Sequence, residues 1–292
     1  MNSQLKFPVL VLLLFTAFIL FSFHEPCYLK DYGLKGNVKK VVVNDYSAMK
    51  NADGSVKQGP WIDSVIYEFN AGGKLTSSFI YRGRKRPDGS ETYTYDKDGH
   101  LSTHLKVYLN SVLDSSFYTY KNGLLVEKNS YTITHDQVKE HIRTVFTYQM
   151  DQITGEFSIR ENGDTIIGIV NTYNKQGKPD KVTFMEMGKD KKLGLKSNKS
   201  FLYNNEGFLT ATTESGDGPG DIENVWEYNK QGDATFFATK NSMFVMKTYN
   251  EYVYDEKGNW IKNTSSVSQE QTESKNPAKM PRSVSTRTIT YY

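Results

Sequence analysis

A few residues of this chain have the types and spacing of metal ligands. His100 and His104 stand four residues apart, the spacing of a zinc-binding pair on a helix, while Asp96 and Asp98 precede Gly99 as in the opening of a calcium loop. A calcium loop continues with further oxygen ligands, which are absent here. In a strand, residues four apart are separated by about 13 Å, too far to share a metal. We therefore expect a hairpin turn at this place, with no metal and no cofactor.

The residues that nucleophilic catalysis requires do not occur in a recognisable pattern. Serine and threonine are abundant, but no serine stands in a Gly-x-Ser-x-Gly setting and no Ser/His/Asp grouping is evident. The glycine-dense segment 216–221 has proline and aspartate where a phosphate-binding loop needs backbone donors and a lysine. That segment predicts a turn. We expect no catalytic residues and no enzymatic activity.

Aromatic side chains are the remaining candidates for binding. The aromatic fraction of 13% is high, although the hydrophobic fraction is only 37%. Rings on a sheet surface can stack on sugars or dock a protein segment, and Trp61, Trp226 and Trp260 are the candidates for glycan stacking. The simpler interpretation, which we favour, is that the aromatic residues form the core face of the sheet.

The charge balance gives no indication of a nucleic-acid partner. The chain has 36 basic and 33 acidic residues, a net charge of +3, spread along its length. Its densest basic run, residues 82–86, adjoins a proline and a glycine and predicts a solvated loop.

All these residues are positioned by a nine-residue phrase that occurs about eight times: aromatic, any residue, aromatic, polar turn, glycine, any residue, apolar. The second aromatic falls at Phe69, Tyr95, Tyr120, Tyr148, Tyr173, Tyr203, Tyr228 and Tyr254. Each interval of 25–30 residues holds two strands and leaves no room for a crossover helix. The strands must therefore run antiparallel, one β-hairpin per repeat.

The composition of the phrase follows from strand and turn geometry. Asp or Asn after the second aromatic opens a type I turn, and glycine three positions later takes the left-handed conformation that closes it. The two aromatics lie two apart and so share one face of the sheet. The residue after each glycine varies, and we expect it to be free for function.

The predicted fold is all-β: an antiparallel meander of about eight β-hairpin repeats, either an open twisted sheet or one curled into a barrel. The low hydrophobic content favours an open sheet with solvent on one side. Pairing of the first strand, predicted at 36–46, with the last, at 283–292, would indicate a barrel instead.

The N-terminus predicts export. Residues 7–23 form an apolar run preceded by Lys6, which is typical of an export signal. Three fates remain open: cleavage, with the position after Ser22 as the least unsuitable site, lipid attachment at Cys27, or an uncleaved anchor, since 17 residues span about 25 Å as a helix. Cys27 is the single cysteine, so no intrachain disulfide can form. The expected domains are an export signal or membrane/lipid anchor at 1–27, a tether and first strand at 28–60, and the β-hairpin repeat domain at 61–292.

The phrase is clearest at residues 93–101 and 252–260, where it is aromatic-x-Tyr-Asp-x-x-Gly-x-apolar. This resembles the YD-type (Rhs-like) repeats of bacterial cell-envelope and secreted proteins. The resemblance extends from about Trp61 to Tyr292 and implies long β-hairpins wound into a continuous sheet. It suggests a small member without a toxin domain, although the family usually has arginine after the glycine and this chain does not.

Together these observations predict a non-enzymatic extracytoplasmic scaffold that contacts a protein or polysaccharide partner at the cell surface. The alternative is a glycan-binding envelope protein that uses aromatic residues on the sheet surface. We expect a periplasmic, outer-membrane, cell-surface or secreted location, no nucleic-acid partner, and membrane contact only through the N-terminal segment.

Overall fold

The computed structural model describes residues 27–83, 86–108, 112–134, 137–216, 220–271 and 280–292. The expected export signal or anchor at 1–26, with the cleavage position after Ser22, lies outside the described residues, and its fate stays a prediction. Among the residues that are described, no helix is long and apolar enough to cross a bilayer.

The described chain forms one 18-stranded sheet and one short 3₁₀ helix. The elements in order are η1 (Leu29–Tyr32), β1 (Val38–Lys50), β2 (Val56–Phe69), β3 (Leu75–Arg82), β4 (Gly89–Tyr95), β5 (Leu101–Tyr108), β6 (Val112–Lys121), β7 (Leu124–Thr134), β8 (Gln137–Gln149), β9 (Gln152–Arg160), β10 (Thr165–Tyr173), β11 (Pro179–Met187), β12 (Leu193–Tyr203), β13 (Leu209–Gly216), β14 (Ile222–Tyr228), β15 (Ala234–Lys240), β16 (Phe244–Tyr254), β17 (Trp260–Gln271) and β18 (Met280–Tyr291).

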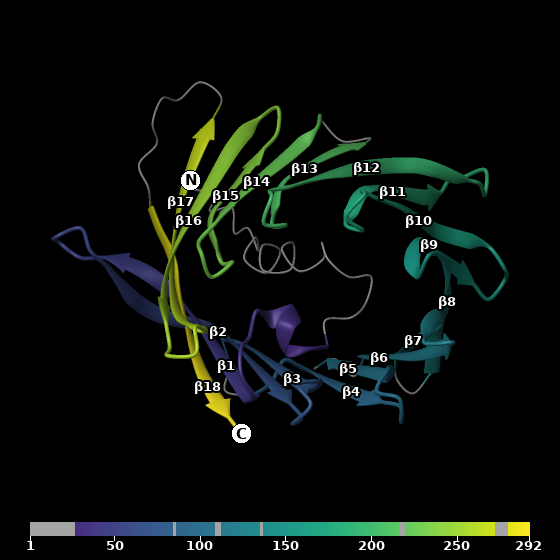
Figure 1. Ribbon diagram of the computed structural model, residues 1–292, viewed down its shortest axis with the longest axis horizontal. Helices are drawn as coiled ribbons and strands as arrows, with labels where there is room; N and C mark the ends of the chain where they lie inside the picture. Colours follow the sequence, from purple (N-terminus) through teal and green to yellow (C-terminus); the bar gives the residue numbers. More distant parts are fainter. Residues whose placement is uncertain (1–26, 84–85, 109–111, 135–136, 217–219, 272–279) are drawn as a thin grey trace, which may run out of the picture.

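The sheet closes into a barrel (Figure 1). Every strand pairs antiparallel with its neighbours in sequence, and β1 also pairs with β18, with Val42 opposite Thr288 and Asn44 opposite Thr286. The all-β meander is thus confirmed, and of the two predicted forms the chain adopts the barrel. The low hydrophobic content favoured the open sheet because it indicates a sheet that is exposed to solvent. A barrel whose sheet is exposed to solvent has the same low hydrophobic content.

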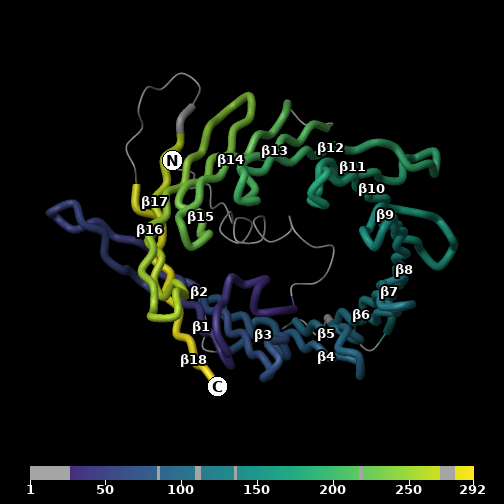
Figure 2. The backbone as a smooth tube through the Cα atoms, in the orientation of Figure 1, coloured from purple at the N-terminus to yellow at the C-terminus, as the bar shows by residue number. Residues whose placement is uncertain are grey.

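Eight hairpins, from β2–β3 to β16–β17, correspond to the eight copies of the phrase. The turn at Gly99 is representative: the Gly99 N–H donates to the Asp96 carbonyl at 3.0 Å, its φ is +87°, and a bulge lies just before the turn, at Thr94 and Tyr95. The β8–β9 hairpin departs from the prediction, because Gly155 lies within β9 and Met150 and Asp151 take the positive φ values. These hairpin turns share one end of the barrel, the turn rim, where β1 begins and β18 ends (Figure 2).

The paired aromatics of the phrase point into the lumen. Helix η1 lies inside the ring of strands (Figure 1). Its Tyr32 ring is 4.7 Å from that of Tyr67 and 5.6 Å from that of Phe69. Strand register then places the equivalent aromatics of the neighbouring strands on the same face. The aromatic face is therefore the inner wall of the barrel.

Successive repeats are locked together through these tyrosines. The Tyr95 hydroxyl donates to the Leu75 carbonyl at 2.7 Å, and Leu75 is the apolar residue that ends the preceding phrase. The same bond joins Tyr148 to Leu125 at 2.6 Å. Each such bond ties one hairpin to the one before it.

The variable residue after the glycine also acts between repeats. Lys74, which follows Gly73, donates to the Gly99 carbonyl at 2.7 Å and lies 5.1 Å from the centre of the Tyr95 ring. Lys178 makes the equivalent contacts with the next repeat. The expectation that this position is free for function is therefore wrong at these copies, because a long side chain at the turn reaches the neighbouring hairpin.

Candidate functional site

The three tryptophans lie in different surroundings. Trp61 on β2 is 37% exposed, and its indole N–H donates to Ser64 at 3.2 Å. Trp226 on β14 is only 8% exposed and packs against Phe237 inside the barrel. The guanidinium group of Arg287 lies over the ring of Trp260 on β17. Among the described residues no contact joins any two of the tryptophans, so they form no common stacking platform.

Cys27, the predicted lipidation site, is buried at 3% exposure. It belongs to a luminal cluster with Leu34, Phe69 and Leu75, and the Leu75 N–H donates to its carbonyl at 2.7 Å. A lipid on the Cys27 thiol would require this side chain to leave the cluster.

A polar cluster on β4 and β5 was not predicted. Antiparallel register sets Tyr93 opposite His104 and Glu91 opposite Lys106. The Glu91 carboxylate accepts from the Tyr93 hydroxyl at 2.5 Å and lies 3.1 Å from His104 Nε2 and 3.0 Å from Lys106 Nζ. The Tyr93 and His104 rings stack at 4.4 Å. Every member faces the lumen.

The cluster holds Glu91 as a carboxylate. Burial opposes ionisation, but the bonds from His104, Tyr93 and Lys106 outweigh it, and the pKa of Glu91 is lowered to about 2. The negative charge of Glu91 is thus compensated inside the cluster.

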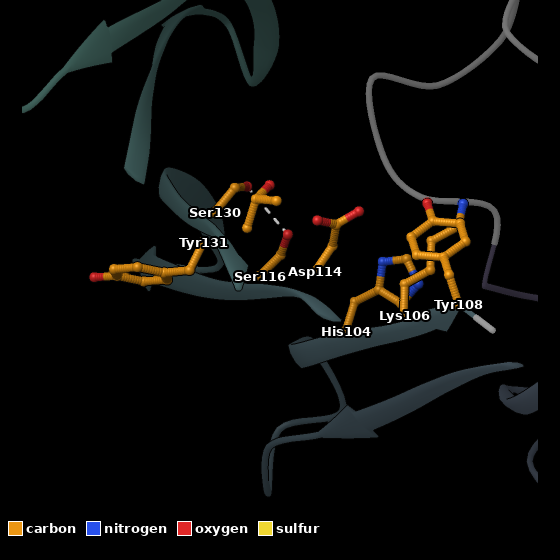
Figure 3. Close-up of a pocket in the computed structure, with 8 residues that line it drawn as sticks. His104, Lys106, Tyr108, Asp114, Ser116, Ser130 and Tyr131 are labelled. Atoms are coloured by element: carbon orange, nitrogen blue, oxygen red, sulfur yellow. Dashed lines mark hydrogen bonds between the residues drawn. The ribbon is translucent and has the colours of Figure 1, made fainter. Parts of the chain in front are cut away.

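A pocket of about 320 Å³ continues from this cluster along the wall (Figure 3). Its lining residues are His104, Lys106 and Tyr108 on β5, Asp114 and Ser116 on β6, and Ser130, Tyr131 and Thr132 on β7. Figure 3 shows Ser116 joined to Ser130, a hydroxyl pair at 3.1 Å. Tyr131 points away and stacks instead on His141.

Two further ionisable groups on the inner wall have unusual surroundings. Burial raises the pKa of Glu156 to about 7, opposed by Lys128, and its Oε1 has no hydrogen-bond partner in the part of the chain that the structure describes. Burial lowers the pKa of Arg287 to about 10, and its guanidinium carbon stands 3.6 Å from the centre of the Trp260 ring. Register places both on the luminal face, with Glu156 opposite Phe146 and Arg287 opposite Val43.

The metal-ligand candidates of the sequence were His100 and His104, together with Asp96 and Asp98. Within the described ranges, no group of three or more His, Cys, Asp or Glu side chains has the geometry of a metal site. His100 and His104 make different contacts: the His100 ring stacks on Tyr120, while His104 bonds to Glu91.

The sequence did contain the signal for the luminal cluster. The turn at 96–99 fixes the register of the strands beside it. Counting outward from that turn, with one residue for the bulge, pairs Tyr93 with His104 and Glu91 with Lys106. Linear spacing along the chain, by contrast, does not reveal partners on neighbouring strands.

Comparisons with known proteins give a limited likeness of fold. A porin-like protein from Bacteroides uniformis ATCC 8492 shares 12% identity at a TM-score of 0.46, covering 88% of this chain and 98% of that one. A porin-like protein from Bacteroides vulgatus ATCC 8482 shares 11% at 0.37, covering 87% and 98%. The TcdB2-TccC3 structure shares 12% at 0.37, covering 80% of this chain and 14% of that one.

No family model matches the sequence, and none of the curated proteins does. Similarity at this level carries no information about activity or partners. The resemblance to YD-type repeats therefore stays a prediction.

Proposed function

We propose that this chain is a non-enzymatic extracytoplasmic scaffold whose inner barrel wall, rather than its outer face, contacts a partner. The observation that carries the proposal is closure of the sheet with the aromatic and polar groups of the repeats turned inward. Inner walls with such a mixture of rings and hydrogen-bonding groups are typical of binding surfaces. The partner is a protein or polysaccharide at the cell surface.

The charged side chains on the outer face favour a barrel that is surrounded by water rather than by lipid. Lys40 and Glu68 pair across β1 and β2 at 3.3 Å, and Arg143 approaches Glu127 at 3.6 Å across β7 and β8. Strand register places these side chains on the outer face of the barrel. Outward charges also lie along β14 to β17, at Glu223, Glu227, Lys240, Lys247, Glu251 and Lys262. A charged residue costs about 2–4 kcal/mol at the middle of a lipid-facing barrel wall.

Export is inferred from the N-terminal sequence, and the scaffold role from the wall. The wall contains bonds that hold hairpins together, such as the one from Tyr95 to Leu75, and polar groups whose pairing fixes their geometry, such as Glu91. The alternative of glycan stacking on tryptophans has less support, because Trp226 is buried and Trp260 lies under Arg287.

The experiment compares the two faces of one strand. Thr239 on β15 faces the lumen, bonded to Asn224 at 2.8 Å, and the adjacent Ala238 faces outward. A photo-crosslinking benzophenone amino acid is placed at either position in the full chain, expressed in its native cell. We expect intermolecular adducts from position 239 and not from 238. Adducts from 238 alone, or from neither position, would contradict a macromolecular partner that contacts the inner wall.

A further inference from the structure

The pocket next to Glu91 has chemistry that selects one class of ligand. Its ionisable groups compensate one another: Glu91 lies 3.0 Å from Lys106 and 3.1 Å from His104, and register sets Asp114 opposite Lys106 on β6. Two carboxylates disfavour an anionic ligand. Because Lys106 lies beside Glu91 and opposite Asp114, the pocket does not attract a cation strongly either. Neutral ligands remain.

The groups that face the pocket include paired donors and acceptors. Ser116 and Ser130 form a hydroxyl pair at 3.1 Å, and Thr132 stands two residues along the same face of β7. A hydroxyl is both donor and acceptor and keeps capacity for a further bond. The Asp114 carboxylate adds a charged acceptor, and such bonds are stronger than neutral ones.

This hydroxyl surface continues along the wall beyond the pocket. Thr144 on β8 and Ser158 on β9 form a second hydroxyl pair, also at 3.1 Å. Register places both on the luminal face. From β5 to β9 there are four strand spacings, or roughly 19 Å. The hydroxyl side chains along this path are small, and the pocket covers the part of the path on β5 to β7.

We propose that this strip, from Asp114 through Ser116, Ser130 and Thr144 to Ser158, binds a neutral polyhydroxylated chain, a short oligosaccharide segment. Tyr108, 38% exposed at the edge of the pocket, has Lys106 Nζ 5.5 Å from its ring centre on one face and offers the other face to the apolar side of a sugar. The inference rests on the proposed function, since it requires a lumen that a partner can enter, and it names the chemistry of that partner.

The test is a titration of the full chain with defined hexasaccharides. Maltohexaose, cellohexaose and the hexamer of N-acetylglucosamine are neutral probes, and hexagalacturonate is the anionic comparator. We expect at least one neutral probe to bind, with at least tenfold weaker binding in Asp114→Asn and in Ser116→Ala. Hexagalacturonate should bind more weakly than the best neutral probe.

The neighbouring Ser115 supplies the matched control. It lies on the outer face, opposite Leu105 and Tyr131, and is 5% exposed. Ser115→Ala makes the same chemical change one residue away and should leave binding unchanged. Unfolding curves of all variants separate loss of binding from loss of fold.

Three results would overturn the proposal: no binding of any neutral probe, stronger binding of hexagalacturonate, or equal losses in Ser115→Ala and Ser116→Ala. If luminal adducts from position 239 persist in that event, the saccharide class is wrong and the scaffold function stands. If oligosaccharides bind as expected but position 239 gives no adduct, the strip is confirmed and the macromolecular partner is not.

Discussion

At the scale of single residues, the inner wall contains ionisable groups whose pKa values are shifted in opposite directions by their surroundings. Glu91 is compensated by three neighbours and its pKa falls to about 2, whereas burial raises that of Glu156 to about 7. Both are glutamates on the luminal face of a strand. The difference arises from the partners that register sets beside each one.

Glu156 makes stability depend on pH near neutrality. Since its pKa in the folded chain exceeds the 4.5 of a free side chain, its contribution is fully present below about pH 4.5 and is lost as pH rises through 7. Glu156→Gln should therefore be more stable than the natural chain at pH 8.5, by at most about 3 kcal/mol, with the difference vanishing near pH 4.5. Urea unfolding between those pH values measures it.

The control for this change is Glu206→Gln, at an exposed turn position. It makes the same chemical change at the surface and is measured over the same pH range. If Glu156→Gln and Glu206→Gln follow the same curve, Glu156 does not titrate in this range.

Glu91 predicts the opposite dependence. Its pKa is lowered, so its stabilising contribution is present above about pH 4.5 and is lost as pH falls toward 2. Glu91→Gln should be less stable than the natural chain at pH 6, and the gap should narrow as pH falls toward 2. Acid titration followed by circular dichroism provides the measurement, and a constant gap between the two proteins would argue against the assignment.

The hydrogen bonds from tyrosine hydroxyls that join successive repeats can be tested by removing a single oxygen atom. Tyr95→Phe removes the hydroxyl that bonds to Leu75 and leaves a buried carbonyl with one partner fewer, a loss of about 1 kcal/mol. Tyr228→Phe is the matched control, because the Tyr228 ring stacks on Phe208 and no bond from its hydroxyl is found among the described residues. Equal urea midpoints for the two variants would show that the bond contributes nothing.

At the scale of elements, the turn glycine has two roles that can be separated. Gly99 and Gly163 both have strongly positive φ, +87° and +85°. A Cβ at Gly163 meets nothing within 4 Å, whereas one at Gly99 displaces the Lys74 ammonium group. Gly163→Ala should cost about 1 kcal/mol from backbone strain alone.

Gly99→Ala should cost roughly 1 kcal/mol more, because Lys74 also loses its bond to the Gly99 carbonyl and its position over Tyr95. Denaturant midpoints of the two variants give the difference. The explanation fails if Gly163→Ala is as destabilising as Gly99→Ala.

The turns and the strand faces could be predicted from sequence because both depend on local geometry. Asp96 and Gly99 are sufficient to predict a turn, and the spacing of Tyr93 and Tyr95 is sufficient to predict a shared face. Contacts between repeats were not predictable in this way. The bond from Lys74 to Gly99 and the charge compensation at Glu91 depend on which side chains meet across strands.

At the scale of the whole molecule, closure was beyond the sequence because open and closed meanders use the same hairpins. What distinguishes them is pairing between β1 and β18, which are separated by nearly the full chain. The segment of residues 27–37, which precedes β1, reinforces this seam. The Lys35 N–H donates to the Asn259 side chain at 2.7 Å, and the Leu29 N–H donates to the Gly73 carbonyl at 3.0 Å. This segment thus contacts hairpins on both sides of the junction.

The most direct test of the account is therefore a cross-link across the seam. In a Cys27→Ser background, cysteines replace Val42 and Thr288, which lie opposite each other on β1 and β18. Cysteines at Glu251 and Thr264, opposite each other within the β16–β17 hairpin, serve as the positive control. A short bifunctional thiol reagent should join both pairs within one chain and to a similar extent, as a closed barrel requires. Efficient linkage of the hairpin pair with none between positions 42 and 288 would show an open sheet and contradict the barrel.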